Sequence, residues 1–159
     1  MNLKCGYTLH MENNNSDNNL GHWICDNNII PINAVGFIYE ITNNLNNKKY
    51  IGKKVLKFKI KVRSKESKKK VGGKSKIKNK PISKYITSDY KTYTGSSSKL
   101  NKDITQYGIS NFTFKILYFC YSKTELSYKE IEEIIYKKAI YSKDYYNEYL
   151  YLRLRFRKI

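Results

Sequence analysis

The sequence predicts an α+β fold, in which helices flank a small three-stranded antiparallel sheet that carries a long basic insertion. Two observations predict the sheet. Apolar and polar residues alternate on both sides of an Asn-rich turn within residues 34–55, and they alternate again at Phe112–Cys120. A third observation, apolar residues at helical spacing in residues 124–140, predicts the main helix. A length of 159 residues suits one compact domain with a modest extension.

The composition divides the chain into three parts. Residues 1–33 are expected to form a partly disordered N-terminal extension that begins with an Asn-rich tract. Within it, residues 22–32 are expected to form a short hairpin or a lead-in segment laid against the domain. Residues 34–150 form the domain itself, including a basic insertion at 57–81. Residues 151–159 are a basic tail.

Residues 34–55 are expected to form a hairpin, because Asn accepts the left-handed backbone of tight turns. A turn centred just after residue 44 would place Tyr39 directly opposite Tyr50 and Phe37 opposite Gly52. Opposed residues share a face, with Cβ atoms about 5 Å apart. Two phenols at that distance could pass a proton between them or hold a water. The simpler interpretation is an aromatic pair that stabilises the sheet.

The second half of the chain predicts a helix, a strand and a second helix. Residues 96–107 suit a helix that opens on Ser and closes at Gly108. In the following strand and helix, apolar residues are expected to share one face each. These residues are Phe112, Phe114, Ile116 and Tyr118 in the strand, and Leu126, Ile131, Ile134, Ile135 and Ala139 in the helix.

The formal net charge is +18, and it is concentrated in the insertion. Between Lys53 and Lys80 there are thirteen Lys and one Arg against a single acid, Glu66. Self-repulsion predicts a long loop there, with some helix or strand inside it at most. A field of this sign attracts polyanions, so nucleic acid is the leading partner and an anionic membrane surface the second.

Nothing in the sequence favours a membrane-spanning or secreted protein. No apolar run approaches the roughly 18 residues of a spanning helix, and the N-terminus lacks a signal pattern. We therefore expect an intracellular, non-secreted protein in the cytoplasm of its host cell. The three Cys are scattered and imply no disulfide framework. Zinc held by Cys5, His10, His22 and Cys25 is a minor alternative, because the ligand types fit but the spacing is not that of a standard finger.

The hairpin resembles the signature of the GIY-YIG nuclease family. Gly36-Phe37-Ile38-Tyr39 stands for the first triplet, with one residue more, and Tyr50-Ile51-Gly52 for the second. The turn between them resembles that of phage intron homing endonucleases. Segments 96–108, 111–117, 124–130 and 145–147 are also similar to the family's helix, third strand, metal-binding helix and late Asn. The resemblance covers about residues 35–150 and implies a divalent-metal DNA endonuclease.

Helix geometry independently selects the carboxylate for the metal. At about 100° per residue, Glu130 lies at the edge of the buried stripe, whereas Glu132 points nearly opposite. A carboxylate partly withdrawn from water needs a partner, and a hard cation such as Mg²⁺ (or Mn²⁺) suits an oxygen ligand. The alternative is a capping box in which Ser127 caps the helix with Glu130.

Three further features bear on the implied site. The family's phosphate-binding Arg would correspond to Arg63, although a solvated surface Arg or a role for Lys53 or Lys54 is nearly as good an interpretation. Asn147 would hydrogen-bond within the site and hold the late segment; a simple turn Asn is the alternative. Many family members carry a His before the first long helix, where residues 94–95 here are Thr and Gly, so loss of activity is an open alternative.

The resulting hypothesis is a phage-type homing endonuclease that hydrolyses DNA with a divalent metal, acting as a monomer or as a homodimer on DNA. Tyr50 or Tyr39 would orient or deprotonate the attacking water, with Glu130 on the metal and Arg63 on the phosphate. The rival hypothesis is a non-catalytic basic nucleic-acid-binding protein. The lysines expected to contact DNA are Lys53, Lys54, Lys57, Lys68, Lys69 and Lys70.

Overall fold

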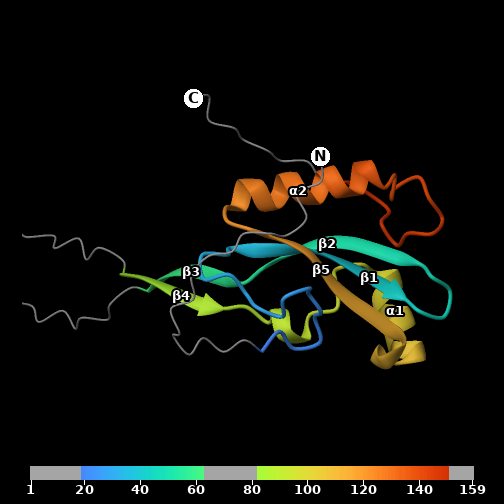
Figure 1. Cartoon of the computed structure of the whole chain (residues 1–159), viewed down its shortest axis with the longest axis horizontal. Coiled ribbons are helices and arrows are strands. Elements are labelled where there is room, and N and C mark those ends of the chain that lie inside the picture. Colours follow the sequence, from blue (N-terminus) through green and yellow to red (C-terminus); the bar gives the residue numbers. More distant parts are fainter. Residues whose placement is uncertain (1–18, 63–81, 151–159) are drawn as a thin grey trace, which may run out of the picture.

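A computed structural model of the chain describes residues 19–62 and 82–150 (Figure 1). A three-stranded antiparallel sheet forms its centre, in the order β2-β1-β5. A separate two-stranded ribbon, β3–β4, joins the sheet through the end of β2. The elements in chain order are β1 (Gly36–Asn43), β2 (Lys49–Val55), β3 (Lys57–Val62), β4 (Ile82–Thr87), the 3-10 turn η1 (Tyr90–Thr92), α1 (Ser98–Tyr107), η2 (Ile109–Asn111), β5 (Phe112–Cys120) and α2 (Lys123–Tyr136). The predicted α+β fold is confirmed.

The central strand β1 is buried on both of its faces. Phe37 and Tyr39 lie in an aromatic cluster between the sheet and the segment that precedes β1, whereas Ile38 packs with Leu126 and Ile134 of α2. Helix α2 therefore covers one face of the sheet, and α1 lies on the other side (Figure 1). Strand β1 alternates in the direction of its side chains but not in polarity, as is usual for a strand covered on both faces.

The hairpin register differs from the predicted one by two residues. Tyr39 is opposite Gly52, not Tyr50, and Tyr50 is opposite Ile41. The turn is centred one residue later than predicted, and within it the Asn43 and Asn46 side chains accept hydrogen bonds from the backbone N–H groups of residues 45 and 48. An even shift leaves every side chain on its predicted face. Tyr39 and Tyr50 thus remain neighbours on one face, although they are not directly opposed.

The predicted helices and third strand are present, with two corrections. Tyr118 lies on the α2 face of the sheet and not with Phe114, because a bulge in the β1–β5 register gives the aromatic face to Phe119. Helix α2 ends at Tyr136, earlier than predicted, since Lys138 takes a positive φ of 51°. Ile135 lies inside the helix but is exposed, so it does not belong to the predicted buried face, while Ala139 is buried just beyond the helix.

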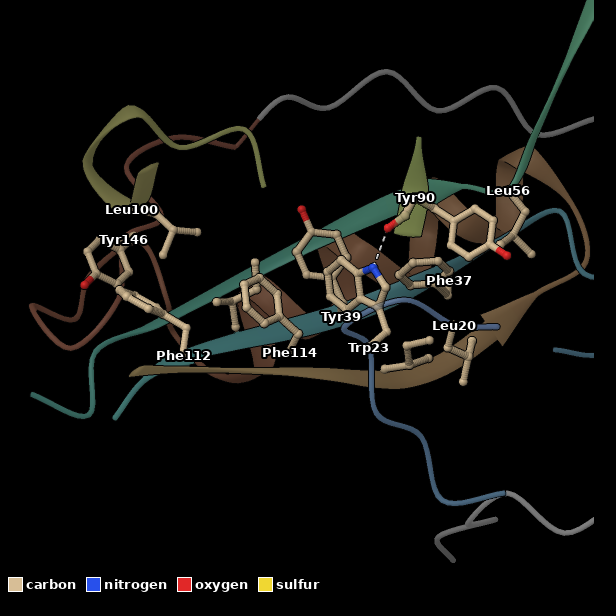
Figure 2. Close-up of a cluster of buried hydrophobic side chains, with 12 residues drawn as sticks. Leu20, Trp23, Phe37, Tyr39, Leu56, Tyr90, Leu100, Phe112, Phe114 and Tyr146 are labelled. Atoms are coloured by element: carbon tan, nitrogen blue, oxygen red, sulfur yellow. Dashed lines mark hydrogen bonds between the residues drawn. The ribbon is translucent and has the colours of Figure 1, made fainter. Parts of the chain in front are cut away.

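Residues 19–35 form no hairpin but a lead-in segment with one parallel bridge, between Ile24 and Lys115. Trp23 is 2% exposed, packs on Phe37 and Tyr39, and donates its indole N–H to the backbone oxygen of Tyr90 (Figure 2). A single large anchor holds this segment, so a paired strand is not needed to fix it. The packed unit therefore begins before residue 34.

Paired strands flank the insertion: β3 lies at its start, and β4 begins just after its predicted end at residue 81. A long loop with some helix or strand inside it was predicted, but this pairing was not. Strands β3 and β4 are antiparallel, from Lys57 opposite Thr87 to Val62 opposite Ile82. Residues 63–81 lie outside the described part of the chain. Alternating Lys and β-branched or aromatic residues in β3 suit a strand, and the high local charge concealed that pattern.

Candidate active site

Tyr39 and Tyr50 form the centre of the candidate site, with ring centroids 6.1 Å apart. Tyr39 is 1% exposed and lies in the core, whereas Tyr50 is half-buried and reaches the surface. Gly52 lies against the Tyr39 hydroxyl, and a Cβ there would collide with it. Gly95, with φ +96°, leaves room for the Tyr50 ring in the same way, because an added Cβ would lie 3.2 Å from Cε1 of Tyr50. The second glycine of the signature therefore serves Tyr39.

Both phenols are held in their neutral form. Burial, the neighbouring Tyr50 and Tyr93, and a hydrogen bond to Tyr93 raise the pKa of Tyr39 well above 10. Burial also raises the pKa of Tyr50, although a hydrogen bond from Ser96 partly offsets that effect. The Tyr50 hydroxyl lies 2.8 Å from Ser96 Oγ. The surroundings of the described residues thus raise both pKa values, which weakens either phenol as the base that the sequence suggested.

Tyr93 is a third phenol that the sequence argument missed. The centroid of its ring lies 6.3 Å from that of Tyr39 and 3.4 Å from Lys54 Nζ, which makes a cation–π contact with it. Lys54 is also ion-paired with Asp89 at 2.7 Å. Tyr93 immediately precedes Thr94-Gly95, the position at which many members of the GIY-YIG family carry a His. That position is the only feature of the sequence that could have singled out Tyr93 from the sixteen tyrosines as a site residue.

Glu130 projects from α2 toward β2, as its place at the edge of the buried stripe predicts. Its side chain is 20% exposed, and one carboxylate oxygen lies 2.8 Å from Lys53 Nζ. The same ammonium group donates a hydrogen bond to Ser127 Oγ at 3.1 Å. Ser127 lies inside the helix, whose N-cap is Ser122, so the capping-box interpretation of Ser127 and Glu130 is wrong. Sequence reasoning named both Lys53 and Glu130 but not their contact.

A pocket of about 320 Å³ brings these groups together. Its lining includes Tyr50 and Lys53 of β2, Glu130 of α2 and Ser96 just before α1. Tyr39 does not line it and instead supports the Tyr50 ring from behind. The pocket therefore presents a hydroxyl pair, an ammonium group and a carboxylate to whatever enters it.

Asn147 closes the pocket beside β2. Its side chain donates to the backbone oxygen of Ile51 at 2.9 Å and accepts from the backbone N–H of the same residue at 3.0 Å. Strand β2 is an edge strand, and the segment around Tyr145 pairs with it in parallel at Lys49. Asn147 thus completes the hydrogen bonding of an edge that would otherwise be open. Its predicted part in catalysis stays a prediction.

The remaining predicted residues lie elsewhere. Lys57 is exposed at the start of β3. Arg63, Lys68, Lys69 and Lys70 lie outside the described residues, as do Cys5 and His10 of the zinc alternative.

The other two residues of the zinc alternative are engaged in the lead-in segment. His22 Nε2 lies 3.0 Å from the Tyr93 backbone oxygen, and burial lowers the pKa of its ring. Cys25 is half-buried against the aromatic cluster. Packing thus gives both residues a role without a metal.

A divalent cation suits the pocket through one carboxylate. Within residues 19–62 and 82–150, no three His, Cys, Asp or Glu side chains form a metal-binding group. Mg²⁺ commonly takes one or two protein carboxylates and completes its shell with water and substrate phosphate. Glu130 meets that requirement, provided that Lys53 moves away from its oxygen.

None of the helices in the described part of the chain is long and apolar enough to cross a membrane.

Comparison with known proteins gives one family. The family described as "Putative endonuclease segE, GIY-YIG domain" matches residues 23–150, which is most of the chain and includes the pocket and the Trp23 anchor. Searches of curated proteins and of solved structures found no significant match.

Proposed function

The chain belongs to the GIY-YIG family of endonucleases, and from that premise we propose that it hydrolyses DNA phosphodiester bonds with a divalent cation bound at Glu130. One observation carries the proposal: Tyr50, Lys53 and Glu130, from two different elements, converge on one pocket. The resemblance of the hairpin turn to phage intron homing endonucleases supports a phage-type homing role.

Lys53 is proposed to bind the scissile phosphate. Its ammonium group now neutralises Glu130 at 2.8 Å, so an incoming phosphate and a cation at the carboxylate would each take one partner of that pair. The exchange keeps every charge matched, which avoids the cost of an unpaired charge in a half-buried pocket. The chemistry that a bound Mg²⁺ supplies there is polarisation of the phosphate and stabilisation of the leaving oxygen.

Tyr50 is proposed to orient the attacking water and not to deprotonate it alone. Its raised pKa keeps the phenol neutral near pH 7, so a general base of this kind would be weak. A neutral hydroxyl that shares one hydrogen bond with Ser96 Oγ still has a donor or acceptor position left for a water. Tyr39 would fix the ring of Tyr50 from behind. The family's Arg would correspond to Arg63, whose role remains the sequence-based proposal.

The test is nicking of supercoiled plasmid by the purified chain with Mg²⁺ or Mn²⁺. We expect Glu130→Gln to lower the nicking rate by about 10²- to 10³-fold and Tyr50→Phe by about 10²-fold. Glu132→Gln is the matched control, since Glu132 is on the same helix but pairs with Lys129. Tyr136→Phe is the control for tyrosine, because Tyr136 is 80% exposed. Both control variants should nick like the wild type.

DNA binding, measured by fluorescence anisotropy in EDTA, separates this proposal from its rival. Retained binding with lost nicking in Glu130→Gln supports the endonuclease. A wild type that binds duplex DNA but never nicks it with either metal would favour the non-catalytic nucleic-acid-binding protein. Equal nicking by the wild type and both site variants would remove this pocket from the reaction.

A further inference from the structure

The β3–β4 ribbon carries a basic surface outside the pocket. We propose that it is a DNA-contact arm, which lays one of its two faces along the duplex beyond the scissile phosphate. This inference rests on the proposed function for its substrate, DNA, but not for its chemistry. It concerns residues 57–62 and 82–87 only, and it assigns them a face-specific role that a charged loop would not have.

The register of the ribbon separates its charge from its apolar residues. Lys57, Lys59 and Lys61 are opposite Thr87, Tyr85 and Ser83, and these six side chains share one face. The other face carries Phe58, Ile60, Val62, Ile82, Lys84 and Ile86. Charge complementarity assigns DNA to the lysine face, because three ammonium groups and three hydroxyl groups stand there together. Phosphate oxygens accept hydrogen bonds from both kinds of group.

Exposure shows that neither strand is used to build the core. Every residue of β3 and β4 is exposed, including Tyr85 at 64% and Phe58 at 46%. Tyr85 stands directly opposite Lys59, at the middle of the basic face. A large aromatic ring in that position can pack on sugar or base edges, while the flanking lysines bind phosphate. The arrangement is that of a contact surface and not of a packing surface.

The base of the ribbon is fixed to the strand that carries the site. Leu56, between β2 and β3, is 4% exposed and donates its backbone N–H to the Val35 oxygen at 2.9 Å. Ser88, just after β4, donates its backbone N–H to the Leu56 oxygen at 2.9 Å and its hydroxyl to the Val55 oxygen at 2.5 Å. The arm therefore leaves the body at a fixed point and is not tethered through a flexible linker.

The distance from the site suits one continuous DNA contact. Lys57 on the arm follows Lys53 in the pocket by four positions, a span of at most about 13 Å along an extended chain. Figure 1 places the ribbon at the opposite end of the molecule from α1, continuing past the sheet. DNA that delivers a phosphate to Lys53 could then continue along the arm. A two-stranded ribbon is also narrow enough to enter the major groove of B-DNA.

The test compares two triple substitutions that remove the same charge. The arm variant is Lys57→Gln, Lys59→Gln and Lys61→Gln; the control variant is Lys102→Gln, Lys115→Gln and Lys143→Gln, three exposed lysines of the body. Binding of a labelled duplex of arbitrary sequence is measured by anisotropy in EDTA over a salt series. Circular dichroism and thermal unfolding of both variants check that each is folded.

Each lost phosphate contact lowers the slope of log K against log salt by about 0.9, so the arm variant should lose about 2 to 3 in slope and bind at least about tenfold more weakly. The control variant should lose less than about 1. Equal slopes for the two variants would overturn the arm, even if the wild type nicks plasmid. If the arm variant loses more slope than the control variant but the wild type never nicks plasmid, the DNA-contact arm is supported and the endonuclease proposal is rejected.

Discussion

In the three-stranded sheet of the body and in the β3–β4 ribbon, which follows β2 directly, successive side chains of a strand point to opposite faces. In the body, alternation leads to burial on both faces: Phe37 and Ile38 are each 0% exposed. In the ribbon, the same alternation leaves every residue exposed. A strand pattern thus predicts backbone conformation, while burial depends on what packs over the strand. Helix α2 and the lead-in segment cover the body sheet.

The two regions should therefore respond differently to mutation. Burial of apolar area stabilises the body sheet, whereas cross-strand pairs and the attachment at Leu56 hold the ribbon. Side chains of the ribbon are free from packing constraints, so they can be devoted to a surface role. Side chains of β1 and β2 are constrained on both faces, and the site residue Tyr39 is itself part of the core.

The largest effect is expected from Phe37→Ala. Phe37 is 0% exposed and contacts Trp23, Tyr39, Tyr90 and Phe119. Its loss should lower the free energy of unfolding by about 3–5 kcal/mol, because transfer and cavity terms add. Phe58→Ala on the ribbon is the matched control and should cost no more than about 0.5 kcal/mol. Urea unfolding followed by circular dichroism measures both, and similar losses would refute the comparison.

A second prediction concerns the edge of the body sheet. Asn147→Ala removes two hydrogen bonds to Ile51, leaving both of its backbone groups without a partner at a residue that is 0% exposed. The expected loss in the free energy of unfolding is about 2 kcal/mol. Asn27→Ala, at an exposed turn of the lead-in segment, should change it by less than about 0.5 kcal/mol. The prediction fails if urea unfolding cannot distinguish the two variants.

The sequence predicted the faces of the hairpin better than its register. Tyr39 and Tyr50 share a face under either register, because the two-residue shift preserves side-chain direction. The register itself depends on the side chains of Asn43 and Asn46, which accept hydrogen bonds from the backbone of the turn. Because the turn contains several Asn residues, the sequence did not show which of them would do so. The position of Glu130 at the edge of the buried stripe was predicted because helical periodicity needs no information from the rest of the chain.

Contacts between distant elements could not be predicted. The Lys53–Glu130 pair joins β2 to α2, and nothing local distinguishes Lys53 from the lysines around it. Tyr93 and Ser96 reach the two signature tyrosines only after the chain has passed through the ribbon and back. The ribbon was missed for a different reason, since its charge outweighed a strand pattern that was present in β3.

The smallest effect is expected where the body holds a charge in fixed geometry. The Glu40 carboxylate lies 2.9 Å from Lys137 Nζ and 3.1 Å from Lys49 Nζ. Burial alone would raise the pKa of Glu40, but the two ammonium groups more than offset that effect and lower it below its ordinary value of 4.5. A lowered folded-state pKa gives stability that is fully present above the ordinary pKa and is lost as the pH falls through the lowered one.

Glu40→Gln should therefore lower the free energy of unfolding by about 1 kcal/mol at pH 7, and the difference from the wild type should shrink toward pH 3. The control is Lys59→Gln, which removes one exposed charge of the ribbon and should change stability by less than about 0.5 kcal/mol at either pH. Urea unfolding at both pH values tests this. A Glu40→Gln deficit that does not shrink as the pH falls below 4.5 would mean that packing, and not charge, holds this face of β1.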